Sequence, residues 1–152
     1  MPEMGWDTRW LELADHIGSW SKDRSTKVGC VIVGSANQIL SLGYNGFPRG
    51  VNDYVPERHD RPAKYRWTEH AERNAIYNAA RTGTNLTGGV LYVPWFPCID
   101  CARGIVQAGI KAVVSTMPEN YEEEFLARWA DDFRTSYEIL NESRVAIRYV
   151  ER

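Results

Sequence analysis

The feature that most constrains the fold is the alternation of apolar, β-rich segments with helical ones in the second half of the chain. The segments 89–95, 110–116 and 144–150 have the length and composition of strands, and helical stretches at about 97–108 and 119–140 separate them. Two strands of one sheet that are joined through a helix run parallel, with a right-handed crossover. We therefore expect the last strand to run parallel to the strand at 110–116.

The first half of the chain adds a helix, a hairpin and a second helix. Apolar residues spaced at i, i+3, i+4 and i+7 predict an amphipathic helix over about 7–20. The apolar segments 27–34 and 38–44 are separated by a short turn and predict a hairpin. A second helix is expected over 70–82, with Gly83 as its stop. Together these elements predict an α/β fold of three layers, in which helices cover both faces of a five-stranded mixed sheet.

The segment 45–68 follows neither a helical nor a strand period. It contains three prolines, mixed charges and several aromatic residues. An irregular segment of this length inside a compact domain is unusual and tends to carry function. No repeat, low-complexity tract or linker divides the chain, so we expect residues 1–152 to form one domain.

Cys98 and Cys101 stand three residues apart at the start of the helix at 97–108, so their side chains share one face. Two thiolates at this spacing can bind one tetrahedral Zn²⁺. They can also be two small half-buried residues or a redox pair. The chain has three cysteines, and this odd, low number argues against a disulfide framework. The third, Cys30, lies within an expected strand and is most simply a buried apolar residue.

His70 is the best remaining ligand candidate, because it begins the helix that follows the irregular segment. In a parallel α/β arrangement its helix and that of Cys98 start side by side at one sheet edge, where sites of such folds gather. Three protein ligands leave the fourth zinc position open for water, as in catalytic zinc sites.

Glu72 follows His70 by two residues, and a carboxylate there can move the proton of the zinc-activated water. Alone, His70 and Glu72 are explained as polar residues at a helix end. A His-x-Glu segment followed by Pro-Cys-x-x-Cys, however, is the signature of zinc nucleobase deaminases. The two segments together predict a catalytic zinc site.

The charge balance restricts the partners that we expect. The chain has 18 basic and 20 acidic residues, which gives a formal charge of −2, and no basic stripe of the kind that binds nucleic acid. It shows neither a signal peptide nor an apolar span of membrane length. We expect a cytoplasmic protein that binds neither a membrane nor a nucleic acid polymer.

Several segments resemble the cytidine deaminase superfamily, and in particular its deoxycytidylate (dCMP) deaminases. They read STKVGCVIV, SLGYNGFPRGVND, HAERNAI and LYVPWFPCIDCARGIVQAGIKAVV, and Trp129 in the last helix extends the match from about residue 7 to the end. The GYNGxPxG pattern discriminates best, because adenosine-editing and guanine deaminases usually differ there. The resemblance implies a cytidine deaminase-like fold and the zinc-dependent hydrolysis of dCMP to dUMP and ammonia.

Carried over residue by residue, the resemblance makes His70, Cys98 and Cys101 the zinc ligands and Glu72 the proton shuttle. Some relatives hold a second zinc through extra cysteines or histidines in the irregular segment. This chain has only His59 there, so we expect one zinc per chain.

Other residues are candidates for substrate contacts. The resemblance places Asn45 at the sugar and the Ala71 backbone at the pyrimidine edge. The 5′-phosphate needs cations, and the candidates are Arg24, Lys27 and Arg49. Trp95 and Phe96 are expected to wall the pocket, and the resemblance implies that Tyr121 lies near the substrate. Each also has a plainer explanation: a turn residue for Asn45, solvated side chains for the three cations, and core or helix-end packing for the aromatic residues.

Relatives in this family are commonly hexamers that dCTP activates and dTTP inhibits, at a site near the GYNG segment. The resemblance therefore implies a homo-oligomer with a dCTP or dTTP effector, which Mg²⁺ can accompany. Arg49 and the charged segment 50–68 leave open whether this regulation is retained. Also open are the same chemistry on dCTP, CMP or a modified dCMP, a nucleic-acid-editing deaminase, and a zinc module without catalysis.

Overall fold

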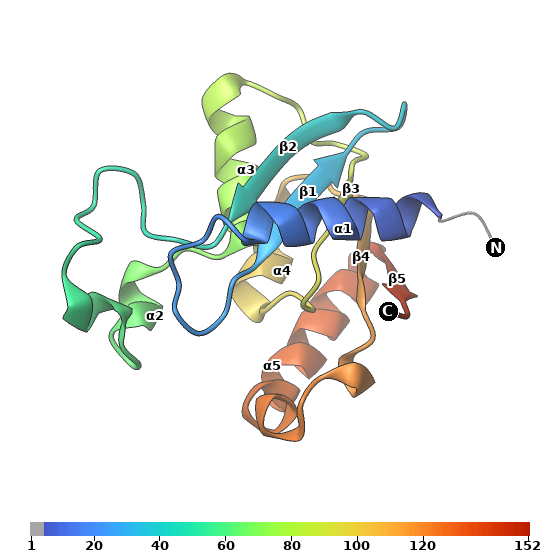
Figure 1. The fold of residues 1–152 in the computed structure, drawn as a ribbon. Helices are drawn as coiled ribbons and strands as arrows, with labels where there is room; N and C mark the ends of the chain where they lie inside the picture. Colours follow the sequence, from blue (N-terminus) through green and yellow to red (C-terminus); the bar gives the residue numbers. More distant parts are fainter. Residues whose placement is uncertain (1–4) are drawn as a thin grey trace.

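The computed structural model describes residues 5–152, in which five strands form one mixed sheet with helices on both faces (Figure 1). The helices of at least nine residues are α1 (Trp6–Gly18), α3 (Ala71–Thr82), α4 (Ile99–Gln107) and α5 (Glu123–Glu142). The strands are β1 (Gly29–Val33), β2 (Ile39–Tyr44), β3 (Val90–Tyr92), β4 (Ala112–Thr116) and β5 (Ala146–Val150). Among these helices, none is long and apolar enough to cross a membrane.

The strand order is β2-β1-β3-β4-β5. Strand β1 pairs antiparallel with both β2 and β3, whereas β3 with β4 and β4 with β5 are parallel. The predicted hairpin, the mixed sheet and the parallel last pair are therefore confirmed. The parallel pairs arise because α4 and α5 each return the chain to the same end of the sheet before the next strand.

Two hydrophobic clusters, one on each face of the sheet, account for the three layers. Helix α1 covers one face, where Leu11 and Ala14 pack with Val31 of β1. Helices α3, α4 and α5 cover the other, where Cys30 and Ile32 of β1 are buried. The side chains of β1 alternate between the two clusters, as the two-residue period of a strand requires. Cys30 is the buried apolar residue that the sequence predicted.

Two glycines allow helices to approach the sheet closely. A Cβ at Gly29 would lie 1.9 Å from the Ala14 carbonyl oxygen of α1, and one at Gly43 would lie 2.5 Å from the Ala75 nitrogen of α3. No larger residue fits these distances, so each glycine sets how its helix sits on the sheet. For α3 this fixes the helix that begins after His70.

The segment 45–68 is more ordered than its sequence suggested. It contains a 3-10 turn, η1 (Pro56–His59), and one helical turn, α2 (Lys64–Trp67). Four residues are too few to show a period, which is why the sequence pattern missed both. Gly46 and Glu69 exchange two backbone hydrogen bonds, of 3.1 and 2.8 Å, so the segment leaves and rejoins the fold at one place beside α3.

Smaller differences lie at element ends. Strand β3 ends at Tyr92 rather than 95, and Pro94, which has no N–H group, is one reason that the ladder stops. Helix α5 begins at Glu123 rather than 119, because Pro118–Asn120 forms the 3-10 turn η2. Gly83 ends α3 with a left-handed φ of 71°, as predicted.

Candidate active site

The site lies where two helices begin at the same edge of the sheet. Helix α3 follows β2, helix α4 follows β3, and the two helices contact each other. His70 is the N-cap residue of α3 and Cys98 that of α4, and neither side chain caps its own helix. Both side chains are therefore available to face each other across the gap between the helix ends.

His70, Cys98 and Cys101 form the group that can hold a metal ion within residues 5–152. The Nδ1 atom of His70 lies 3.4 Å from the Cys98 sulfur and 3.7 Å from the Cys101 sulfur. A tetrahedral zinc with Zn–N of about 2.0–2.1 Å and Zn–S of about 2.3 Å places nitrogen and sulfur about 3.6 Å apart. The spacing of the three donors therefore fits one zinc ion.

The two cysteines differ in acidity. The hydrogen bond from Cys101 is the main reason that the pKa of Cys98 falls to about 4, and the bond to His70 adds to it. The same pairing with Cys98, together with burial, raises the pKa of Cys101. A thiolate is the form of cysteine that binds metal, so the lowered pKa favours the ligand form of Cys98.

Glu72 lies in the first turn of α3 and borders the same cavity as His70 and Cys98. Its side chain is 5% exposed, and burial raises the pKa of its carboxyl group. A carboxylate with a raised pKa accepts and returns a proton more readily near neutral pH. This is the property that a proton shuttle needs.

Arg73 follows Glu72 and was not predicted as a site residue. Its Nη1 atom lies 3.5 Å from the Cys101 sulfur and 3.8 Å from the Cys98 sulfur. Its Nε atom donates to Glu69, one helical turn earlier. The only sequence feature that could have indicated Arg73 is its i,i+4 spacing from Glu69. Such pairs are common on helices that have no functional site.

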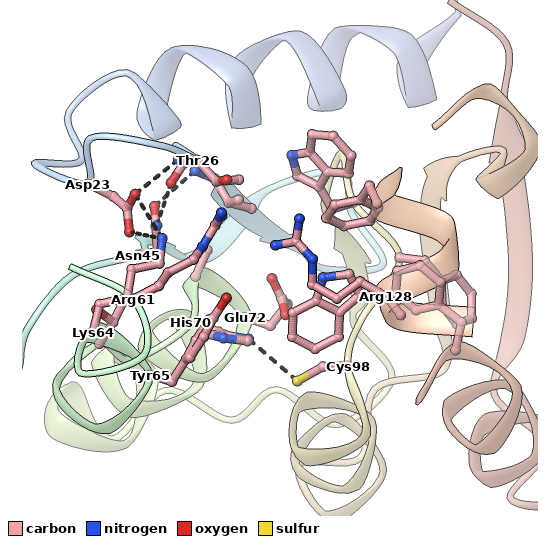
Figure 2. A pocket seen from close by; sticks show the side chains of 18 residues that line it. Asp23, Thr26, Asn45, Arg61, Lys64, Tyr65, His70, Glu72, Cys98 and Arg128 are labelled. Carbon is pink, nitrogen blue, oxygen red and sulfur yellow. Dashed lines mark hydrogen bonds and ion pairs between the residues drawn. The ribbon is translucent and has the colours of Figure 1, made fainter. Parts of the chain in front are cut away.

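A cavity opens beside the three ligands, and residues from five parts of the chain line it (Figure 2). Of the predicted residues, it is lined by Asn45, His70, Ala71, Glu72, Trp95, Phe96 and Cys98. Asn45 also accepts a hydrogen bond from the Val28 amide and donates one to the Thr26 carbonyl, of 2.9 and 2.8 Å. An amide has further donor and acceptor capacity, so these bonds orient Asn45 without exhausting it.

The structure does not bring the other four candidates to the cavity. Arg24 and Lys27 are exposed outside its lining, and Arg49 donates to Asn78 at a separate hollow over β2 and α3. Tyr121 lies behind the wall: its ring packs on Trp95 at 4.9 Å, and its hydroxyl accepts from the Phe96 amide. These residues are close to the motifs along the chain. The direction of each loop, however, decides whether a side chain faces the cavity, and the sequence does not show it.

Three other cations line the cavity instead. Arg61 and Lys64 come from the irregular segment, and Arg128 comes from α5. Lys64 is buried and donates to Asp23 and Ser25, with a shortest bond of 2.7 Å to the Ser25 hydroxyl. Arg61 and Arg128 reach into the cavity from opposite sides, and neither has an ion-pair partner in the described part of the chain (Figure 2).

Aromatic side chains form much of the remaining wall of the cavity. Trp95 packs against Phe125 with ring centroids 4.7 Å apart, and Trp129 and Phe133 of α5 complete this side of the cavity. Flat aromatic rings beside the three metal-binding residues and Glu72 can stack on a planar ligand and keep bulk water out of the cavity. The sequence predicted a long helix over 119–140 but not which of its residues reach the site.

A family model for the "Cytidine and deoxycytidylate deaminase zinc-binding region" matches residues 4–117, which is most of the chain. The chain belongs to this family. The match covers His70, Glu72, Cys98 and Cys101, so the donor group in the structure lies within the family's zinc-binding region. Helix α5 lies outside the matched residues.

Individual relatives agree with this. An uncharacterized deaminase from the luxG 3′ region of Aliivibrio fischeri is 41% identical over 145 residues, which are 95% of this chain and 93% of that protein. Human deoxycytidylate deaminase is 40% identical over 123 residues, with 78% of this chain and 67% of that protein covered. The crystal structure of dCMP deaminase from the cyanophage S-TIM5 with dCMP and dUMP superimposes with a TM-score of 0.74 at 25% identity, over 97% of this chain and all of that one. The predicted cytidine deaminase-like fold is confirmed.

Proposed function

We propose that this chain, as one zinc-dependent deaminase domain over residues 1–152, hydrolyses dCMP to dUMP and ammonia. One observation carries the proposal: His70, Cys98 and Cys101 stand at zinc-binding distances beside buried Glu72 in an aromatic cavity. The substrate follows from the relatives, since one is a human deoxycytidylate deaminase and another was crystallised with dCMP and dUMP.

When it is bound, the zinc supplies the acidified water that hydrolysis needs. Glu72 would take a proton from the attacking water and deliver it to the ring nitrogen N3 as the water oxygen bonds to C4. The same carboxyl group would then take the proton of the new hydroxyl on C4 and deliver it to the amine, which leaves a carbonyl oxygen on C4. The C4–N bond breaks, and ammonia leaves. The raised pKa of Glu72 suits both halves of this transfer.

The remaining residues bind and orient the nucleotide. Ala71 borders the cavity next to Glu72, and its backbone is proposed to hold the pyrimidine edge, with Asn45 at the sugar. Trp95 and Phe96 wall the base, and Tyr121 supports that wall from behind. For the 5′-phosphate we propose Arg61 and Arg128, because a guanidinium without an internal partner is free to pair with a phosphate dianion.

Assembly and regulation are proposed from the family resemblance alone. We infer a cytoplasmic homo-oligomer, a hexamer by that resemblance, with a dCTP or dTTP effector and Mg²⁺ as its companion ion. The hollow beside the GYNG segment, lined by Gly46, Phe47, Arg49 and Arg81, is the candidate place for the effector. Its two arginines suit a polyphosphate.

The test of the substrate is a panel of dCMP, CMP, dCTP, deoxycytidine and guanine, with ammonia release as the readout. We expect the highest kcat/KM on dCMP. Activity highest on deoxycytidine would refute the assignment to a mononucleotide, and activity highest on dCTP or CMP would replace dCMP by that nucleotide. Adding dCTP or dTTP with Mg²⁺ to the dCMP assay tests the effector.

A further inference from the structure

Helix α5 holds the chain on both sides of the zinc-ligand residue Cys98. The Ile99 amide donates to the Oδ2 atom of Asp132 at 3.2 Å, and the Ser136 hydroxyl donates to the Pro97 carbonyl at 2.7 Å. Asp132 and Ser136 are one turn apart on α5, which packs beside α4 (Figure 1). Cys98 lies between the two residues that these bonds fix.

The bond from the Ile99 amide to Asp132 satisfies one of the free amides at the start of α4. The N-cap residue of a helix normally accepts hydrogen bonds from the first free amides with its own side chain. The N-cap residue of α4 is Cys98, whose sulfur faces His70 and makes no cap bond. The carboxylate of Asp132 accepts from the Ile99 amide, the first of the helix, at the helix end that favours a negative charge.

The burial of Asp132 and Ser136 indicates that their hydrogen bonds to the Cys98 segment are part of the packed structure and not surface contacts. The Ser136 side chain is fully buried, and Asp132 is half-buried with no ion-pair partner in the described residues. The adjacent Asp131 has a completely exposed side chain. Two neighbouring aspartates of the same helix therefore differ in their contact with the metal-ligand segment.

We propose that Asp132 and Ser136 are positioning residues that set the place of the Cys98 sulfur and thereby the affinity of the zinc site. Both lie beyond the residues that the family model matches. The same helix lines the cavity through Arg128 and Trp129, so α5 contacts both the substrate side and the ligand side of the site. The inference rests on the zinc centre and not on which nucleotide is the substrate.

The test is zinc affinity, measured by competition with a chromophoric chelator. We expect Asp132→Ala to weaken zinc binding by about 10- to 100-fold, the usual effect of removing a residue that orients a metal ligand. Asp132→Asn should recover most of this loss, because its amide oxygen can accept from the Ile99 amide. Asp131→Ala is the matched control and should bind zinc as the unaltered protein does.

Cobalt(II) in place of zinc gives a second readout that a general loss of stability does not alter. The visible spectrum of the cobalt protein reports the geometry of its thiolate ligands. We expect it to change in Asp132→Ala and to stay the same in Asp131→Ala. Ser136→Ala removes the second bond, and we expect weaker zinc binding there too, so the test remains decisive if Asp132→Ala does not fold.

Four results would overturn the proposal. The first is an unaltered zinc affinity and cobalt spectrum in folded Asp132→Ala, and the second is an equal loss of zinc affinity in Asp131→Ala. The third is a loss of zinc affinity in Asp132→Asn as large as in Asp132→Ala. The fourth is an unaltered zinc affinity in Ser136→Ala. None of these measurements uses a nucleotide. An unaltered protein that binds zinc but does not deaminate dCMP would refute the proposed function and leave this inference standing.

Discussion

The Nη1 atom of Arg73 lies 3.5 Å from the Cys101 sulfur and brings a positive charge to the thiolate side of the metal centre. The same atom lies 3.8 Å from the Cys98 sulfur, and Glu69 holds the other edge of the guanidinium. Donors to thiolate ligands reduce the negative charge that these ligands pass to a metal. We therefore expect Arg73 to make a zinc ion bound there a stronger Lewis acid.

Arg73→Gln tests this relationship. We expect kcat for dCMP to fall by about 10- to 100-fold and zinc to be lost more readily to a chelator, because the charge facing both sulfurs is removed. Arg103→Gln is the control, since Arg103 is an exposed residue of α4 that pairs with Asp100. Equal kcat values for the two variants would show that the contact with the sulfurs has no catalytic effect.

Glu72→Gln separates metal binding from catalysis. The amide keeps the shape of the side chain but cannot accept and return a proton, so we expect kcat to fall by at least about 10²- to 10⁴-fold. Zinc content, measured by atomic absorption, should stay at one ion per chain. If the variant keeps its kcat, a group other than Glu72 transfers the proton. If the variant loses zinc, Glu72 is part of the metal site.

Arg61→Ala and Arg128→Ala test the phosphate contacts. A hydrogen bond to a charged group is worth about 1.5–3 kcal/mol, so each change should raise KM for dCMP by about 10- to 100-fold. Activity on deoxycytidine, which has no phosphate, should not change. Arg24→Ala serves as the control. A raised KM for dCMP in Arg24→Ala, Lys27→Ala or Arg49→Ala would instead support the phosphate contacts that the sequence suggested.

Asp7 gives a prediction for stability against pH. Burial acts to raise the pKa of its carboxyl group, but the hydrogen bonds from Arg148 and Tyr92 and the charge of Arg148 outweigh it, so the pKa is lowered from 3.8. A lowered folded-state pKa stabilises the protein above the unfolded-state value and loses this effect as the pH falls through the folded-state value.

We therefore expect Asp7→Asn to lower the free energy of unfolding by about 1 kcal/mol at pH 7, as for a partly exposed ion pair with a hydrogen bond. The difference from the unaltered protein should shrink as the pH falls below 3.8. Urea unfolding at pH 7 and at pH 3 measures both values, and Glu12→Gln, at an exposed position of the same helix, is the control. A difference that stays constant between the two pH values would contradict the prediction.

The sequence predicted the elements of the sheet well because their patterns are local. Apolar runs, one helical period and residues of helical propensity predicted every strand and long helix, and the alternation from 89 onward predicted the parallel pairs. The short turns η1 and α2 were missed because they are too brief to show a period. The ends of β3 and α5 shifted where a proline interrupts the backbone pattern.

By itself, the sequence determined the zinc ligands and Glu72 as candidates, because His-x-Glu followed by Pro-Cys-x-x-Cys is a signature that two short segments carry. Only the tertiary structure decided which cations face the cavity and which residues hold Cys98 in place. Arg61, Arg128 and Asp132 come from segments far from these motifs along the chain. Their positions depend on where a long segment folds back and on how α5 packs against α4, and no local period records either.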